Sequence, residues 1–246
     1  MQEYLADALE HLLENVKNVI LSNYFHLLST EIGRSALKKI KKHKKKRKIM
    51  NEVIVKNCSE KNLNVYELQS NGDIYDGVRA SVTMSHDDDN LIVKFDVIEK
   101  QLRRMSTHHN DEVYEDSCVE VFLQREGSPI YRNFELSATM YELVGEGECL
   151  ETRVRLDPKR IDKIERSITI LENTTKRVHY IIDEKINLRD WGFLKDDEKI
   201  EDLKLRCNMT KYGAKLEEPN RLTLFKMKEG YVTFHDKTSF RPIKFV

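Results

Sequence analysis

The sequence predicts an all-β fold, a sandwich or barrel of short antiparallel strands, that follows a helical and basic N-terminal extension. Two patterns support this division. From residue 51 onward, short runs alternate apolar and polar side chains and are separated by polar turns, as expected of strands with one buried face. Before residue 50, apolar residues recur at helical spacing and lead into a run of lysines. We therefore expect two parts, residues 1–49 and residues 50–246.

The N-terminal part is predicted to be an amphipathic helix followed by a Lys/Arg-rich tether. Residues three and four positions apart lie on one face of a helix. An apolar stripe with this spacing is formed by Leu5, Leu9, Leu12, Val16 and Val19. The run KKIKKHKKKRK, Lys38–Lys48, comes later. We interpret the helix as a docking or self-associating element, and Met50 as a candidate natural start of the protein.

The formal net charge of zero hides a strong asymmetry. Residues 1–49 hold 11 Lys and Arg against 5 Asp and Glu, which leaves 31 against 37 in residues 50–246 of the 42 of each sign. A block of like charge is usually solvated, and it can bind nucleic acid or an acidic partner. An interaction protein with a structural sandwich and a binding basic extension is therefore the main alternative to the function developed below.

Neither a leader nor a membrane span is predicted. The start of the chain lacks a basic segment and places Glu10 and Glu14 where a signal peptide would be apolar. No apolar run is long enough to span a bilayer. The four cysteines show no close pairing of the kind that zinc or redox motifs need. We expect a cytoplasmic protein with reduced thiols, an expectation that weakens if the natural start is Met50.

The β part can be divided into strands in chain order. Alternation, together with polar or Gly/Pro-containing turns, marks each strand. The predicted strands are residues 51–57, 78–84, 91–98, 119–124, 131–139, 167–172, 178–186, 203–211, 221–227 and 241–246. Only residues 158–166 favour a helix. The turn SHDDDN, residues 85–90, is interpreted as a plain solvated turn.

Two neighbouring strands carry the polar side chains that point to a function. In VYEDSCVEVFLQ, residues 113–124, Val119, Val121 and Leu123 fit a core, and Glu120 falls on the opposite face. The strand from residue 131 follows after a short turn, so the two should form a hairpin with Glu135 beside Glu120. Asn133 and Tyr131 share that face, and Arg79 and Lys94 are candidate counter-charges. Carboxylates, an amide, arginine and rings together suit a sugar, whose hydroxyls need polar partners and whose C–H face stacks on a ring.

The motifs in these strands resemble those of the family 9 carbohydrate-binding modules and their DOMON-like relatives. YEDSCVEVFLQ followed by YRNFELSATM is similar to the family's core motif, and YVTFHDKTSFRPIKF is similar to its closing pattern. The resemblance covers roughly residues 53–246. It implies an immunoglobulin-like, DOMON-like β-sandwich of two antiparallel sheets that holds the end of a saccharide between two aromatic rings.

The resemblance also implies a role for particular residues. Tyr114 would be the first ring of the clamp and Phe234 the second, with His235 beside it. Glu120 would accept hydroxyl hydrogen bonds, and Glu135 would make a polar contact. Asp116 would hold a loop or a calcium ion of the kind that some members carry. Asn133 and Arg79 complete the predicted carbohydrate-binding residues.

Two departures from the family put the ligand in question. The family favours Trp in the clamp, whereas the single Trp of this chain, Trp191, lies elsewhere, and Arg241 replaces the usual Gly after Phe240. Glu120 and Glu135 could be solvated edge charges, and Tyr114 and Phe234 could cap the core. We expect a non-catalytic protein with no cofactor other than that calcium, associated with breakdown of xylan-type glycans by analogy. A degenerate hydrolase is a third alternative.

Overall fold

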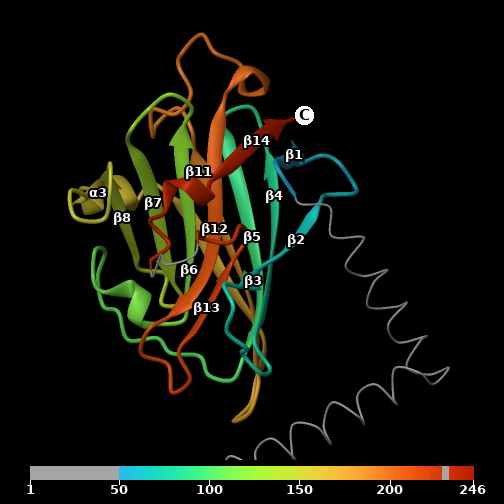
Figure 1. The fold of residues 1–246 in the computed structure, drawn as a ribbon, viewed down its shortest axis with the longest axis vertical. Coiled ribbons are helices and arrows are strands. Elements are labelled where there is room, and N and C mark those ends of the chain that lie inside the picture. Colours follow the sequence, from blue (N-terminus) through green and yellow to red (C-terminus); the bar gives the residue numbers. More distant parts are fainter. Residues whose placement is uncertain (1–49, 229–232) are drawn as a thin grey trace, which may run out of the picture. The chain divides into compact units, whose positions relative to one another are not determined.

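The structure, a computed structural model, describes residues 50–228 and 233–246. This part of the chain consists almost entirely of strands and turns (Figure 1), in agreement with the all-β prediction. Its helical elements are α3 (Pro158–Ile161), η1 (Val113–Glu115), η2 (Ile200–Asp202) and η3 (Lys237–Ser239). The predicted N-terminal helix and the lysine run lie outside the described residues. No helix among the described residues is long and apolar enough to cross a membrane.

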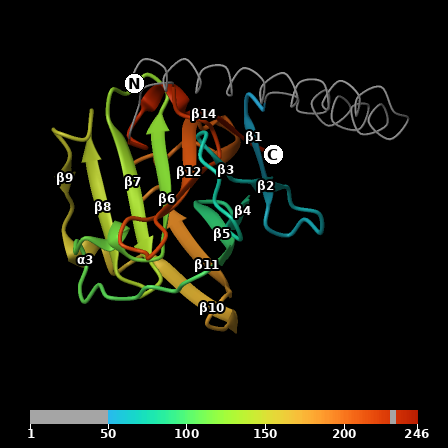
Figure 2. The same ribbon diagram turned by 60° about the horizontal axis from the view of Figure 1, so that its bottom comes forward.

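The strands form two layers that pack face to face (Figure 2). In the first layer the strands lie in the order β10 (Glu165–Asn173), β11 (Val178–Asn187), β5 (Asn90–Glu99) and β4 (Arg79–His86), with β2 (Val65–Glu67) beside β4. In the second layer the order is β14 (Arg241–Phe245), β12 (Leu205–Gly213), β6 (Cys118–Arg125), β7 (Tyr131–Ser137), β8 (Glu142–Gly147) and β9 (Val154–Arg155). Two short strands, β13 (Asn220–Thr223) and β3 (Gln69–Ser70), extend from β12.

Strand β1 (Val53–Asn57) joins the two layers. Its first half pairs in parallel with β14, where Val53 lies opposite Ile243, and its second half pairs in parallel with β4, where Lys56 lies opposite Ser85. The strands of both layers therefore form one continuous sheet, which is curled and contains both parallel and antiparallel pairs. The prediction of two separate antiparallel sheets was wrong at this point, because β1 begins in one layer and ends in the other.

The core between the layers is built by strict alternation. Every second side chain of β5 and of β11 is buried and the intervening ones are half-buried or exposed. Phe95 and Tyr180 lie fully inside. Burial of a phenylalanine side chain such as Phe95 stabilises the fold by roughly 2–3 kcal/mol. This regular pattern is the reason that both strands could be predicted from the sequence.

Strand β6 differs, because it is buried on both faces from Cys118 to Gln124. Met227, Phe234 and Phe240 pack over the face that carries Glu120 and Phe122. Phe240 and His235 place their ring centroids 5.7 and 5.3 Å from that of Phe122. Phe122 alternates with Val121 and Leu123 and so shares the face of Glu120, but it is fully buried because an aromatic cluster closes most of that face.

Four strands, β2, β3, β8 and β9, were missing from the prediction, and β13 was drawn too long. β8 reads ELVGEG and has its first four residues buried on both faces, so it shows no alternation. β9 is only two residues long. β13 ends at Thr223, whereas the predicted strand ran to residue 227. The predicted helix near residue 158 is the single turn α3, which begins at Pro158 with Asp157 as its N-cap.

Candidate functional site

A pocket of about 340 Å³ opens on the second layer, at the end of β6 and β7. Acidic, basic and aromatic side chains share its wall. It is lined by Glu112, Tyr114, Glu120, Glu135, Leu150, Arg153, Arg155, Tyr212, Arg221, Thr233, Phe234 and His235. The structure thus brings together five of the seven residues that the sequence nominated, although they come from segments far apart in the chain.

Two carboxyl groups form the floor of the pocket. Glu120 on β6 lies directly opposite Glu135 on β7, as the predicted hairpin required. Both are buried, with 3% and 2% of their surface exposed. Burial raises the pKa of both carboxyl groups, and the charge of Glu135 raises the pKa of Glu120 further. Two adjacent buried carboxylates repel each other unless one of them is neutralised.

Arg153 supplies the positive charge at this floor. Its Nη1 lies 2.6 Å from Oε1 of Glu135, and this contact opposes the rise in the pKa of Glu135. Burial and the charge of Glu135 therefore favour the neutral form of Glu120, whereas Arg153 favours the ionised form of Glu135. Arg153 was not predicted, because it lies in the connection between β8 and β9. The one sequence feature that relates to its position is Gly145. A side chain at residue 145 would collide with Arg153, because a Cβ atom there would overlap the Arg153 side chain.

Aromatic rings form the sides of the pocket. Tyr114 lies on η1, and a hydrogen bond with Glu112, followed by burial, raises the pKa of its hydroxyl to about 12. Phe234 is 5% exposed and meets the ring of Tyr212 edge-on, with centroids 5.6 Å apart. The guanidinium carbon of Arg221 lies 5.3 Å from the Tyr212 centroid and 5.6 Å from the Phe234 centroid. Tyr212 and Arg221 were both missed by the sequence reasoning.

His235 acts as a neutral group in this wall. Its Nδ1 lies 2.6 Å from the hydroxyl oxygen of Tyr131. Burial, followed by the charge of Arg153, lowers its pKa to about 3. A neutral imidazole can both donate and accept hydrogen bonds. His235 therefore fixes the loop that carries Phe234 to strand β7 without adding charge.

Two nominated residues do not line the pocket. Asn133 is fully buried behind it and donates a hydrogen bond from Nδ2 to Oε1 of Glu135. Arg79 begins β4 in the other layer, opposite Ile98. Lys94, the other candidate counter-charge, lies 3.6 Å from Asp183. The charges that balance the pocket come instead from Arg153, from Arg155 and from Arg221.

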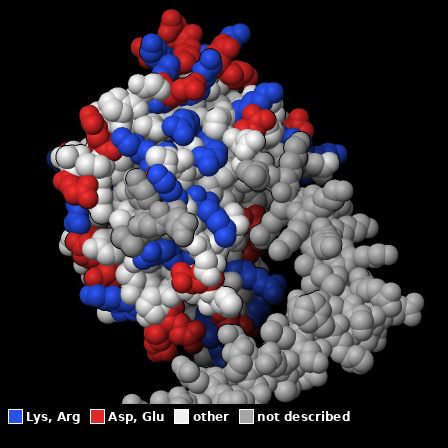
Figure 3. Space-filling model, in the orientation of Figure 1, with Lys and Arg blue, Asp and Glu red and all other residues white. Residues whose placement is uncertain are grey.

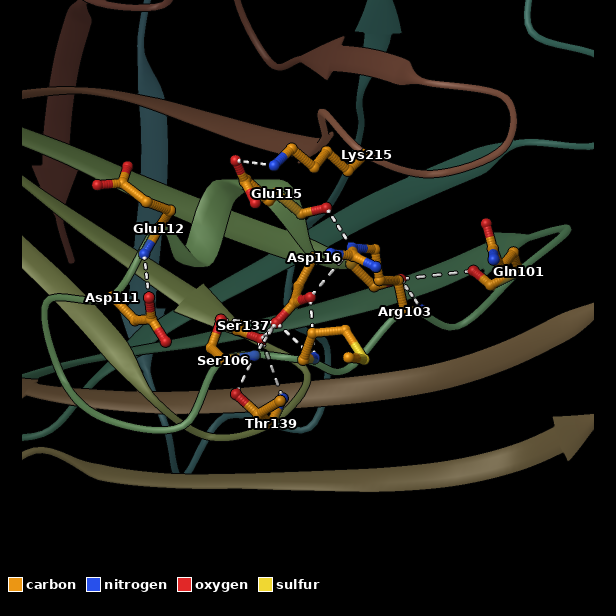
Figure 4. A network of polar contacts seen from close by, with 12 residues as sticks. Gln101, Arg103, Ser106, Asp111, Glu112, Glu115, Asp116, Ser137, Thr139 and Lys215 are labelled. Carbon is orange, nitrogen blue, oxygen red and sulfur yellow. Dashed lines mark hydrogen bonds and ion pairs between the residues drawn. The ribbon is translucent and has the colours of Figure 1, made fainter.

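Asp116 holds the loop below η1 (Figure 4). Its carboxylate accepts hydrogen bonds from the backbone N–H groups of Met105 and Ser106, at 3.0 and 2.9 Å, and from the hydroxyl of Ser137, at 2.9 Å. These donors surround the carboxylate and give it the loop role that was one of its two predicted roles. Among residues 50–228 and 233–246, no three His, Cys, Asp or Glu side chains are grouped so that they could hold a metal ion.

Comparisons with solved structures identify relatives with the same fold. A putative carbohydrate-binding protein from Bacteroides uniformis ATCC 8492 matches with a TM-score of 0.68 and 19% identity, over 80% of this chain and 99% of its own. A family 9 carbohydrate-binding module from Caldicellulosiruptor kristjanssonii in complex with cellotriose matches with a TM-score of 0.53 and 13% identity, over 79% of this chain and 93% of its own. Its complex with glucose gives a TM-score of 0.51 and the same identity.

The sequence itself also matches a known family. The model of carbohydrate-binding family 9 matches residues 65–245, which is most of the part that the structure describes. Among curated proteins, no match is found. The match confirms the resemblance stated from the two motifs, whereas a relationship to DOMON domains stays a prediction. The chain belongs to carbohydrate-binding family 9.

Proposed function

We propose that the pocket binds the end of a saccharide chain, with the sugar ring beside Tyr114 and Phe234 and its hydroxyls on Glu120, Glu135 and Arg153. The observation that carries this proposal is that one pocket combines the aromatic side chains of Tyr114 and Phe234 with a floor of neighbouring hydrogen-bonding groups. Rings bind the C–H face of a sugar, and paired polar groups bind adjacent hydroxyls.

The charges of the pocket favour a neutral sugar at its centre. Three glutamates line it with three arginines. Glu112 is paired with Arg155 at 2.8 Å and Glu135 with Arg153 at 2.6 Å. A ligand rich in hydroxyls can engage these groups by hydrogen bonds without separating the ion pairs. Cellotriose and glucose are bound by the Caldicellulosiruptor relative, and both are ligands of this kind.

Calorimetric titration of the full chain with glucose, cellotriose and xylotriose tests the proposal. Tyr114→Ala removes one ring and should lower the affinity about tenfold or more, because stacking and burial of a sugar face are lost. Tyr141→Ala is the matched control, since Tyr141 is 37% exposed and does not line the pocket. The proposed link to xylan-type glycans predicts that xylotriose binds at least as well as cellotriose. Equal binding by wild type and Tyr114→Ala, or no binding of any of the three, would overturn the proposal.

A further inference from the structure

Two arginine side chains converge on one backbone carbonyl beside strand β14. Arg206, on β12, donates from Nη2 to the carbonyl oxygen of Phe240 at 2.8 Å. Arg241 donates from Nη1 to the same oxygen at 3.0 Å and to the carbonyl of Thr238 at 2.9 Å. Lys237, on the intervening turn η3, donates from Nζ to the carbonyl of Pro129 at 2.8 Å. Two guanidinium groups on one oxygen must lie close to each other.

Within the described part of the chain, no carboxylate is paired with this group. Across residues 50–228 and 233–246, neither arginine nor Lys237 forms an ion pair within 4.0 Å. The nearest acid along the chain, Asp236, is 2% exposed and accepts from the backbone N–H groups of Thr238 and Lys228. By contrast, Arg125 and Arg132 on neighbouring strands each have a glutamate partner. Adjacent cations of this kind repel unless an anion lies between them.

The charged group lies on the same face of the second layer as the pocket. Arg206 and Thr210 are four residues apart on β12, so their side chains share a face. Thr210 lies opposite Glu120 in the pocket floor, and Arg206 lies opposite Gln124. Four residues of a strand span about 13 Å. Figure 3, in the orientation of Figure 1, shows Lys and Arg side chains gathered on the face that carries β12 and β14.

We propose that Arg206, Arg241 and Lys237 form a second binding site, for an oxyanion carried by the same glycan whose end occupies the pocket. The anion is a carboxylate or a sulfate group, because guanidinium groups match the paired oxygens of both. The glycan part of this inference rests on the proposed function; the anion site itself does not. The ligand is then an acidic saccharide with a neutral sugar at its end.

The test compares neutral and acidic ligands that are otherwise alike. The full chain is titrated with xylotriose and with xylotriose bearing a glucuronic acid branch, and with cellotriose and sulfated cellotriose. In the wild type, one acidic ligand should bind about tenfold more tightly than its neutral counterpart, as expected for one charge-assisted pair of hydrogen bonds. The acidic ligand that binds more tightly than its neutral counterpart identifies the anion as a carboxylate or a sulfate. This gain in affinity should become smaller at high salt.

The double variant Arg206→Gln/Arg241→Gln should remove that gain and leave neutral binding unchanged, whereas Tyr114→Ala should weaken both. Arg206→Lys/Arg241→Lys keeps the charge and should retain part of the gain. The matched control is Arg104→Gln, an exposed arginine outside the group. If neither acidic ligand binds the wild type more tightly than its neutral counterpart, or if the gain is the same in the Gln variant, the site is contradicted.

Inorganic sulfate at millimolar concentration separates this inference from the proposed function. If no saccharide binds, sulfate should still raise the melting temperature of the wild type more than that of the Arg206→Gln/Arg241→Gln variant, with chloride as the control anion. Equal sulfate shifts in both proteins would overturn the anion site. An oligonucleotide that binds the wild type but not the variant, while acidic saccharides bind neither, would overturn the glycan assignment.

Discussion

Two pairs of buried glutamates occupy different surroundings in this molecule. Glu120 and Glu135 are neighbours within one layer, open into the pocket and have Arg153 at 2.6 Å. Glu142 on β8 and Glu184 on β11 meet across the two layers, and both are almost fully buried. The nearest cation, Arg166, lies 3.5 Å from Oε2 of Glu142. The first pair lines the pocket and has a close arginine, whereas the second pair, the closed pair, is buried between the layers and has a more distant one.

The closed pair leaves most of its carboxyl oxygens without a hydrogen-bond donor. Both oxygens of Glu184 and Oε1 of Glu142 have no hydrogen-bond partner among the described residues, and the proximity of the two carboxyl groups contributes to their pKa shifts. A carboxylate only accepts hydrogen bonds, so a proton on one member of the pair is favoured. Burial raises the pKa of both, that of Glu184 to about 7. The comparison teaches that both pairs have an arginine, and that the pair with the closer arginine, 2.6 Å against 3.5 Å, is the one that lines the pocket with Tyr114 and Phe234.

Removal of Arg153 should have the largest effect on stability. In Arg153→Met, Glu135 loses its partner, and the free energy of unfolding at pH 7 should fall by about 3 kcal/mol. Urea unfolding measures this loss. Arg177→Met is the control, because the Arg177–Glu172 pair is exposed and its loss should cost under about 0.5 kcal/mol. An Arg153→Met protein as stable as the wild type would show that the pocket pair is not held by an ion.

The closed pair should make stability depend on pH. The pKa of Glu184 rises from 4.5 to about 7 on folding, so the folded protein retains a proton that the unfolded chain has released between these values. Its contribution is therefore complete below pH 4.5 and is lost as the pH rises towards 7. Glu184→Gln, which still donates to Glu142, should reduce this slope by about 1 kcal/mol per pH unit.

Urea titrations at a series of pH values measure the slope for Glu184→Gln and for the control Glu165→Gln, whose side chain is 77% exposed. Above pH 7 the Glu184→Gln protein should be more stable than the wild type. An unchanged slope would contradict proton sharing between the layers.

Replacement of Glu120 should have the smallest effect. Burial and the charge of Glu135 raise the pKa of its carboxyl and favour the neutral form, so Glu120→Gln should change the free energy of unfolding at pH 7 by under about 1 kcal/mol. Urea unfolding beside Glu135→Gln, which separates an ion pair from Arg153 and should cost more, provides the internal comparison. A loss above about 2 kcal/mol in Glu120→Gln would mean that Glu120 is ionised and held by a cation.

The sequence predicted the regular part of this fold and the part of the site that lies on it. Alternation identified β4, β5 and β11, and the β6–β7 hairpin placed Glu120 opposite Glu135. Strands buried on both faces lack alternation, which is why β8 was missed. The arginines were missed for a related reason. Arg153 reaches the pocket from the connection between β8 and β9, whose position is set by tertiary packing. From the sequence alone, a charged residue in a loop is interpreted as exposed to solvent.

A crystal structure of the full chain with cellotriose would show directly whether the pocket holds a sugar. We expect one terminal sugar ring between Tyr114 and Phe234, with hydroxyls within hydrogen-bonding distance of Glu120, Glu135 or Arg153. A saccharide bound elsewhere on the molecule, with the pocket free of sugar, would contradict it.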